Sequence, residues 1–431
     1  MFSGSVWSCS GTAVAKLLSL FAGIVCAHLL TKDQYGQFGI IRSTLNMFVV
    51  LGSVGIGVTV TRYSSMYMKS NPHLVRPIYR ATNRFSLLVG LAVTTLILIC
   101  AHPLAVHALH DESMVTSLQL GAVFLFFSVL NGVQNGALSG LERFRDIAQN
   151  TLLGSIFEAI FMIAGAHLAG VEGAITGFGL GFIVIYAANH LSIRRAFRRL
   201  LPAPTSDEHT VTLDRKILLD CTLPATLTAL TITPVYWFIR SLLIAHGGYS
   251  ELATFEAADQ WKVVILYVPM AASQICLPIL SSLQDGSRKT FARTLLLNVF
   301  IAGTTALVIS AIVMLLGSHI MGLYGREFNS TSALTILMVS TFFCAVANVL
   351  EMALYSLGRI WQCFAINIGW AAITIGTSYI LLVNKHLGAA ALSWGILASY
   401  IFTFCAFSAY VFWGLKHTTH HTALTDGRSQ D

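Results

Sequence analysis

The sequence predicts an all-α integral membrane protein, with twelve transmembrane helices in two six-helix bundles around a central cleft. Hydrophobic residues make up 55% of the chain and charged residues 10%, where a soluble domain has about 45–50% and about 25%. The mean hydropathy is +0.72. Long unbroken apolar runs indicate helices, because a segment in lipid must satisfy its own backbone hydrogen bonds over roughly 20 residues.

Twelve apolar runs are long enough to span a bilayer. Their spacing predicts helices near 11–30, 37–60, 84–102, 115–138, 147–168, 171–191, 217–245, 252–281, 291–316, 330–355, 360–383 and 387–413.

A hydrophilic segment near the middle of the chain, Ser192 to Lys216, separates the two halves. It opens with four arginines and passes through Pro202 and Pro204, a pattern typical of a surface linker. The expected domains are therefore an N-terminal bundle (1–191), a linker (192–216), a C-terminal bundle (217–413) and a tail (414–431).

The basic residues favour one side of the membrane. If the amino terminus is cytoplasmic, the two tails and the even-numbered loops hold nineteen of the 26 Lys and Arg residues. Positively charged loops stay in the cytoplasm, so both termini and the linker are expected there. The net charge of +7 is thus explained by topology, and no nucleic-acid partner is indicated.

The two halves resemble each other at a spacing of about 215 residues. The segment LLTKDQYGQFGII (29–41) matches LLIAHGGYSELATF (242–255), ALSGLERF (137–144) matches ALYSLGRI (353–360), and GVEGAITG (170–177) matches HLGAAALSWG (386–395). Six spans per half predict a parallel repeat about an axis along the membrane normal. Transporters with such repeats bind substrate between the halves and rock them.

Three segments also carry a family resemblance: LLTKDQYGQFGIIRSTLNMFVVLGSVGIGVTVTRY (29–63), NGALSGLERFRDIAQNTLLGS (135–155) and GVEGAITGFGLG (170–181). They resemble the Wzx-type polysaccharide flippases of the multidrug/oligosaccharidyl-lipid/polysaccharide exporter superfamily. The resemblance implies that the first two helices of each half line the central cleft. It also implies a bacterial inner-membrane location.

Several kinds of chemistry have no signature in the sequence. The eight cysteines are scattered singly without a C-x-x-C pair, and the histidines before Asp111 and Glu112 do not have zinc-site spacing. No Walker sequence or nucleophile elbow occurs. We therefore expect no enzyme activity, no metal and no cofactor beyond a coupling ion, H⁺ or Na⁺.

Charged residues within the predicted spans mark candidate functional positions, because burying a charge in lipid costs roughly 2.5 kcal/mol or more. They either form internal salt bridges or line a water-filled cavity. These residues are Lys16, Arg42, Glu158, Arg240, Glu256, Asp259, Lys262 and Glu351.

Polar and aromatic residues lie one or two helical turns from some of these charged residues and so share a helix face with them. Asn46 follows Arg42 by one turn, Tyr236 and Trp237 precede Arg240, and Tyr267 follows Asp259. Lys16, Arg42, Asn46, Arg240, Tyr236, Trp237 and Tyr267 are the predicted substrate-binding residues. Glu256, Asp259 and Lys262 are predicted cleft charges.

The repeat places opposite charges at matched positions. At an offset of 214 residues, set by Tyr35 and Tyr249, Arg42 corresponds to Glu256 and Gly55 to Pro269. Arg42 is therefore expected to pair with Glu256 or Asp259. Gly55, Pro234 and Pro269 are candidate hinges, the alternative being ordinary transmembrane glycine and proline usage.

The leading functional hypothesis is a secondary flippase for an isoprenoid-pyrophosphate-linked oligosaccharide in surface polysaccharide assembly (O-antigen, capsule or exopolysaccharide). The expected partners are the lipid-linked oligosaccharide, membrane lipids, the polysaccharide polymerase and other assembly proteins. One alternative is a multidrug or organic-cation exporter of the same superfamily, expected to have an acidic cavity. Another is a membrane-embedded polysaccharide polymerase or ligase, which the short external loops disfavour.

Overall fold

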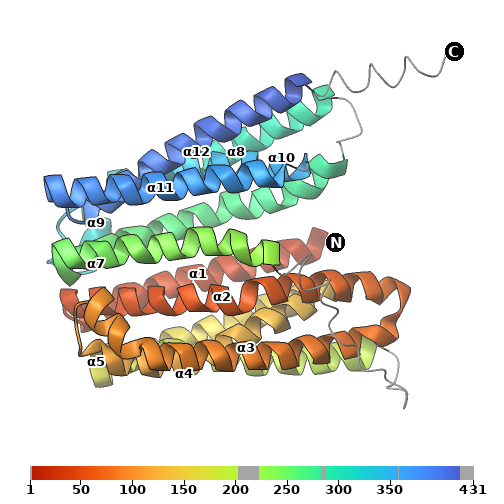
Figure 1. The fold of residues 1–431 in the computed structure, drawn as a ribbon, viewed down its shortest axis with the longest axis horizontal. Coiled ribbons are helices and arrows are strands. Elements are labelled where there is room, and N and C mark those ends of the chain that lie inside the picture. The colour runs from red at the N-terminus through yellow and green to blue at the C-terminus, as the bar shows by residue number, and fades with distance from the viewer. Residues whose placement is uncertain (1, 202–222, 283–287, 358, 418–431) are drawn as a thin grey trace. The chain divides into compact units, whose positions relative to one another are not determined.

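The computed structural model describes residues 2–201, 223–282, 288–357 and 359–417, and the regular elements in this part of the chain are all helices (Figure 1). They are α1 (Phe2–Leu29), α2 (Lys32–Ser70), the 3₁₀ turn η1 (Pro72–Leu74), α3 (Val75–Pro103), the π-helical turn η2 (Leu104–Ala108), α4 (Met114–Gly140), α5 (Phe144–Leu200), α7 (Leu223–Ser282), α8 (Arg288–Leu315), α9 (Gly317–Gly322), α10 (Ser332–Ser356), α11 (Ile360–Lys385) and α12 (Ala389–His417).

The helices confirm an all-α membrane protein. Eight described helices are long and apolar enough to cross a bilayer, and α2 makes a ninth if its two straight parts form one bent span. Most helix ends lie close to the ends of the predicted runs. One difference is the end of α5, which continues to Leu200 and so includes the first residues of the predicted linker. Residues 202–216 of the linker and 418–431 of the tail lie outside the described residues.

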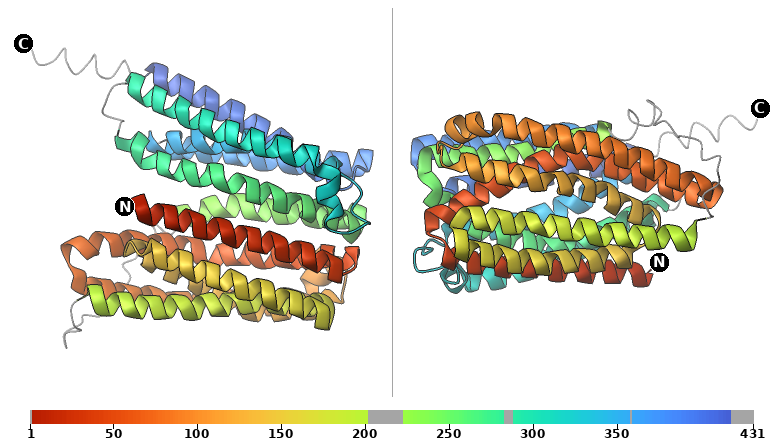
Figure 2. Two further views of the ribbon diagram at one scale, coloured as in Figure 1. Left: turned by 180° about the vertical axis from the view of Figure 1, so that it is seen from behind. Right: turned by 90° about the horizontal axis from the view of Figure 1, so that it is seen from below.

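Helix α5 is a hairpin of two arms. At 57 residues a straight helix would be about 85 Å long, far more than a bilayer. Its backbone leaves helical geometry at Ala169 and Gly170, where Gly170 has φ 57°. The two arms then run back along each other (Figure 2). Gly165 and Gly173 pack backbone to backbone, so a Cβ atom on either would overlap the carbonyl oxygen of the other.

Helix α7 breaks in the same way, at Gly248 (φ 77°, ψ 179°). The predicted hinge residues Pro234 and Pro269 lie on either side of that break, within helical segments. The start of the second arm is held by Tyr249, whose hydroxyl donates to the carbonyl oxygen of Leu109. Burial, and to a lesser degree Asp111, raises the pKa of the Tyr249 phenol, which therefore remains a hydrogen-bond donor.

Helix α2 bends by 45° between its straight parts, Lys32–Val50 and Gly55–Met68. The bend lies in the glycine-containing stretch that includes the predicted hinge Gly55. The start of the helix is fixed by a capping box, in which Thr31 and Gln34 exchange hydrogen bonds between side chain and backbone.

The chain forms two compact units. Unit 1 contains Met1–Ala257 and Gly322–Phe328, and unit 2 contains Ala258–Met321 and Asn329–Asp431. The division falls inside α7, between Ala257 and Ala258. It groups residues by their packing, so the predicted domains, which follow the sequence repeat, stay a prediction.

The segment Gly322–Phe328 belongs to unit 1 because it packs on the α1–α2 connection. The ring of Tyr35 meets Tyr324 and Phe328 at centroid distances of 6.1 and 6.0 Å. Lys32 donates to the carbonyl oxygen of Glu327 at 3.2 Å. All three rings are nearly fully buried, so this short segment completes the core of unit 1 at that end.

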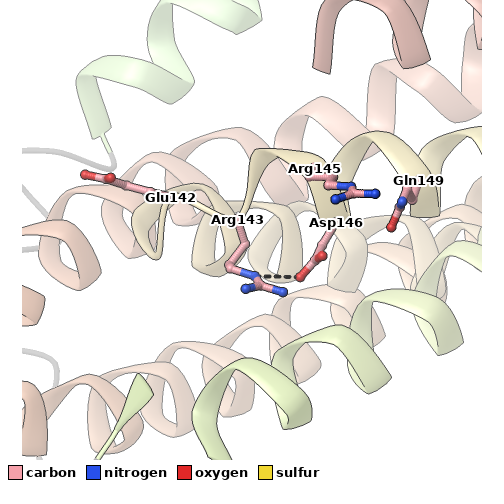
Figure 3. Close-up of a pocket in the computed structure, with 5 residues that line it drawn as sticks. All are labelled: Glu142, Arg143, Arg145, Asp146 and Gln149. Atoms are coloured by element: carbon pink, nitrogen blue, oxygen red, sulfur yellow. Dashed lines mark hydrogen bonds and ion pairs between the residues drawn. The ribbon is translucent and has the colours of Figure 1, made fainter. Parts of the chain in front are cut away.

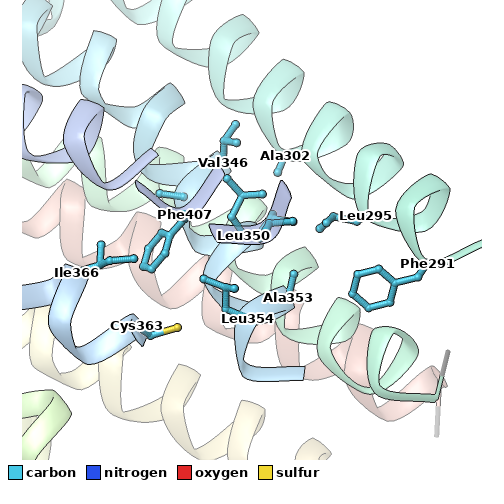
Figure 4. Close-up of a cluster of buried hydrophobic side chains, with 13 residues drawn as sticks. Phe291, Leu295, Ala302, Val346, Leu350, Ala353, Leu354, Cys363, Ile366 and Phe407 are labelled. Atoms are coloured by element: carbon cyan, nitrogen blue, oxygen red, sulfur yellow. The ribbon is translucent and has the colours of Figure 1, made fainter. Parts of the chain in front are cut away.

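The core of unit 2 is built where four helices meet (Figure 4). Phe291 and Leu295 of α8 pack with Val346 and Leu350 of α10, and α11 and α12 contribute further side chains to the same cluster. Cys363, Ile366 and Phe407 complete it. Apolar contact among α8, α10, α11 and α12 thus holds the unit together.

Two connections, α4–α5 in unit 1 and α10–α11 in unit 2, have the same backbone conformation. Arg143 has φ −89° and ψ 48°, and Arg359 has φ −91° and ψ 50°. Each donates its backbone N–H to the residue five positions earlier, Leu138 at 2.8 Å and Leu354 at 3.0 Å. The two arginines lie at matched positions of the sequence repeat.

The glycine contact of the α5 hairpin can be tested by adding one methyl group. We expect Gly173→Ala to lower the free energy of unfolding by about 1–3 kcal/mol, because the new Cβ must push the two arms apart. Thermal unfolding of the purified protein in detergent measures the change. Gly376→Ala is the matched control, since a Cβ there meets no atom within 4 Å. Equal melting temperatures for Gly173→Ala and the native protein would show that the arms are not in contact.

Candidate functional site

A carboxylate shared by two arginines lies inside unit 1. Glu256 accepts from Arg42 through Oε2 at 3.3 Å and from Nε of Arg240 through Oε1 at 2.5 Å. The side chains of Glu256 and Arg240 are 4% and 9% exposed, while that of Arg42 is 18% exposed. We call these three residues the arginine–glutamate cluster. It has one positive charge in excess, and Arg42 is its most accessible member.

The backbone of α7 brings two of these residues together. Arg240 and Glu256 are equally distant from the break at Gly248, so the two arms of the hairpin place them opposite each other. Arg240 also donates to the carbonyl oxygen of Tyr236, one turn earlier, at 3.2 Å. Arg240 is therefore held from two directions.

Helix α2 brings in the third residue by packing closely on α7. A Cβ on Gly36 would overlap the carbonyl oxygen of Tyr249, and a Cβ on Gly39 would lie 2.6 Å from Cγ of Glu256. Glycine at these two positions lets the helices approach until Arg42, one turn beyond Gly39, reaches the carboxylate. The close contact thus sets the geometry of the cluster.

Aromatic rings surround both guanidinium groups. Arg42 lies 5.6 Å from the ring centroid of Phe38, and Arg240 lies 5.6 Å from that of Tyr236 and 5.2 Å from that of Phe255. Such contacts stabilise a cation away from bulk water. Phe38 and Phe255 are not among the predicted site residues, since a single phenylalanine in a membrane helix gives no sequence signal of its own.

The remaining predicted residues of unit 1 lie around this cluster. Trp237 donates its indole N–H to the hydroxyl of Thr44 at 2.8 Å, and Thr44 is two residues beyond Arg42. Lys16 and Asn46 are exposed. Lys16 and Arg42 both interact electrostatically with Glu158 of α5. The ionic interactions of unit 1 therefore involve Lys16 and Glu158 as well as the cluster.

Unit 2 has separate polar groups. Lys262 donates to Asp259 at 3.0 Å, one turn along α7, and both are buried. Tyr267 is half-buried and Pro269 is buried further along the same helix. Glu351 accepts from Tyr355 and from Asn367, each at 3.0 Å. Asn348, three residues before Glu351 on α10, donates to the carbonyl oxygen of Cys344 at 2.9 Å.

A surface hollow of about 350 Å³ lies at the α4–α5 connection and is lined by Glu142, Arg143, Arg145, Asp146 and Gln149 (Figure 3). Two of these lining residues, Arg143 and Asp146, bond to each other at 2.7 Å. Its lining mixes acidic and basic groups and does not include the arginine–glutamate cluster. Among the described residues, no three His, Cys, Asp or Glu side chains group as a metal site.

The pairing of the buried Glu256 with Arg240 leads to a prediction about stability. Removing Arg240 alone leaves Glu256 buried with less compensation, so Arg240→Met should lower the free energy of unfolding by about 3 kcal/mol or more. The double variant Arg240→Met, Glu256→Met should recover part of this loss, because no buried carboxylate remains. Thermal unfolding of both variants measures the coupling. Arg326→Met, at an exposed position, is the control. A double variant less stable than the single one would contradict this account.

Comparison with known proteins finds relatives that are named as an export protein, a flippase and a transporter. A curated relative is the EPS I polysaccharide export inner membrane protein EpsE of Ralstonia solanacearum, 24% identical over 90% of this chain and 88% of that protein. The lipid III flippase of Escherichia coli is 26% identical over 65% of this chain and 67% of that protein. A putative O-antigen transporter of Shigella flexneri is 21% identical over 92% of this chain and 94% of its own length.

Solved structures share the fold. A multidrug resistance MATE family transporter of the MOP superfamily, in an inward-facing conformation, has a TM-score of 0.76 at 18% identity and covers 94% of this chain and 96% of its own. A MOP superfamily transporter from Pyrococcus furiosus has a TM-score of 0.71 at 18% identity, over 96% of this chain and 94% of its own. The family model described as polysaccharide biosynthesis protein matches residues 2–284. This match covers more than half of the 431 residues, and the chain therefore belongs to the polysaccharide biosynthesis protein family.

Proposed function

We propose that this protein is a flippase that moves an isoprenoid-pyrophosphate-linked oligosaccharide from the cytoplasmic to the outer leaflet of the bacterial inner membrane, for assembly of a surface polysaccharide. The observation that carries the proposal is the arginine–glutamate cluster, a membrane-embedded site with two guanidinium groups and one carboxylate. A pyrophosphate offers several anionic oxygens, and guanidinium meets such oxygens with paired hydrogen bonds.

Within this site Arg42 and Arg240 take the pyrophosphate, with Lys16 as a further cation. Arg42 is the group that substrate meets first, because it is the most exposed of the three cluster residues. Tyr236, Trp237 and Asn46 offer ring faces and an amide to the sugars, and Tyr267 of unit 2 stays a predicted sugar-binding residue.

The proposed architecture has twelve spans in two six-helix halves. Breaks at Gly170 and Gly248 support counting α5 and α7 as two spans each. The matching backbones at Arg143 and Arg359 support a parallel repeat.

Both termini and the linker 192–216 are cytoplasmic in this proposal, which follows from the distribution of basic residues. A cysteine introduced in the linker should escape membrane-impermeant labels in sealed cells, and strong labelling would reverse the topology.

A multidrug exporter is the alternative of the same fold. The solved MATE structures share the fold at under 25% identity, which says nothing of substrate. A site that binds organic cations needs excess negative charge, whereas the arginine–glutamate cluster has excess positive charge. An anionic head group therefore fits these residues better. A polymerase or ligase has less support, because the curated relatives are named as an exporter, a flippase and a transporter.

Substitution of Arg42 tests directly whether this residue binds the pyrophosphate. In proteoliposomes with a labelled lipid-linked oligosaccharide, Arg42→Ala should lower the flipping rate at least about tenfold, the effect of losing one or more charge-assisted hydrogen bonds. Arg42→Lys should recover only part of it, since an ammonium cannot bind two oxygens side by side. Arg293→Ala, at an exposed position of α8, is the control. Normal flipping by Arg42→Ala would refute the binding role, and transport of organic cations without flipping would favour the alternative.

Coupling to an ion is a second part of the proposal. If the substrate displaces Glu256 from the arginines, the carboxylate loses its cationic neighbours, and H⁺ or Na⁺ takes their place as the counter-charge. In this proposal Gly55, Pro234 and Pro269 are the hinges about which the halves rock. The competing mechanism is transport driven by the substrate gradient alone.

The two mechanisms differ in their response to imposed gradients. We expect a proton or sodium gradient to change the flipping rate of the native protein, and the double variant Glu256→Gln, Asp259→Asn to lose this response. Flipping in proteoliposomes with and without each gradient gives the answer. Equal flipping rates with and without each gradient would rule out coupling through these carboxylates.

A further inference from the structure

Two helices of unit 1 continue beyond their apolar parts and expose arginines. Helix α3 begins at Val75, ten residues before its apolar part starts at Phe85, and carries Arg76, Arg80 and Arg84. The second arm of α5 ends at Leu200, nine residues after its apolar part ends at Leu191, and carries Arg194, Arg195, Arg198 and Arg199. We call these seven arginines the arginine rim. All but Arg76, which is half-buried, are exposed.

The rim is held in place by contacts between the two helices. Arg76 donates to the carbonyl oxygen of Phe197 at 2.9 Å, near the carboxyl end of α5. The ring of Tyr79 meets that of Phe197 edge to face at 5.4 Å. Val75 and Ala196 lie in one buried cluster with Leu141 and Leu201. These contacts fix the last turns of α5 beside the first turns of α3, so the arginines are arranged before any ligand binds.

The rim has little negative charge to balance it. Neither α3 nor residues 173–200 of α5 contain an Asp or Glu. Leu141 of the buried cluster leads into the neighbouring α4–α5 connection, where Glu142 is exposed and Asp146 is bonded to Arg143. The surface therefore suits an anionic ligand.

The same helix faces continue as exposed leucines. Leu88 follows Arg84 by one turn and is 68% exposed, and Leu191 precedes Arg195 by one turn and is 51% exposed. A ligand on this surface thus meets arginines at one end and apolar side chains at the other. A phospholipid has this arrangement of anionic head and apolar chains, whereas a soluble acidic protein does not.

We propose that the arginine rim binds the head groups of anionic phospholipids, of the phosphatidylglycerol and cardiolipin class, in the leaflet that it faces. This surface is separate from the arginine–glutamate cluster and does not depend on the proposed transport function. Basic side chains at the membrane surface attract anionic lipids electrostatically, and guanidinium groups bind phosphate in a paired geometry.

Native mass spectrometry of the purified full-length protein tests this proposal, with phosphatidylglycerol, cardiolipin and phosphatidylcholine added separately at equal concentrations. The native protein should retain the two anionic lipids at least about threefold more than phosphatidylcholine. The variant with Arg194, Arg195, Arg198 and Arg199 all changed to Gln should lose this preference. The same four changed to Lys should keep most of it.

Two controls make the result specific. The pair Arg326→Gln, Lys385→Gln removes exposed cations elsewhere and should leave the preference unchanged. Thermal unfolding should show that the Gln variant is folded, because Arg76 and its bond to Phe197 are kept. Three results would overturn the proposal: no preference in the native protein, an unchanged preference in the Gln variant, or an equal loss in the control pair.

Discussion

The structure of unit 1 depends on one buried carboxylate that two arginines share. Glu256 is only 4% exposed, and a charge at that depth is tolerated in a membrane protein only when it is paired. Arg240 approaches from its own helix and Arg42 from α2. The cluster therefore ties the α7 hairpin to α2 and leaves a cation at the accessible side, so one set of contacts serves both the fold and the proposed binding.

Glycine residues decide whether the three charged side chains of the cluster can meet. Without glycine at positions 36 and 39, α2 could not come close enough for Arg42 to reach Glu256. Without the left-handed backbone at Gly248, Arg240 and Glu256 would lie on one long helix, sixteen residues and about 24 Å apart. The charges give the cluster its chemistry, and the glycines bring the charges together.

The sequence predicted the helices well because apolar runs of membrane-spanning length are a strong signal. It also suggested that Arg42 could meet Glu256 or Asp259, through the repeat offset; the structure pairs Arg42 with Glu256 and pairs Asp259 with Lys262. Arg240 was predicted as a site residue but not as the second arginine on Glu256, since that contact depends on the conformation at Gly248. Phe38, Phe255 and Asn367 were missed because a phenylalanine or a single amide in an apolar helix has no distinctive spacing.

The shared carboxylate also bears on how an anion would enter the site. Arg42 holds Glu256 through Nη2 alone, although a guanidinium has five N–H donors. A phosphate oxygen can therefore bond to the exposed side of Arg42 while the bond to Glu256 is still intact. Arg240, which binds the other carboxylate oxygen, keeps Glu256 paired during this step. In the proposed function, binding would thus proceed by gradual exchange of partners, without a stage in which a buried charge has no counter-charge, and this would lower the electrostatic barrier that a single ion pair would present.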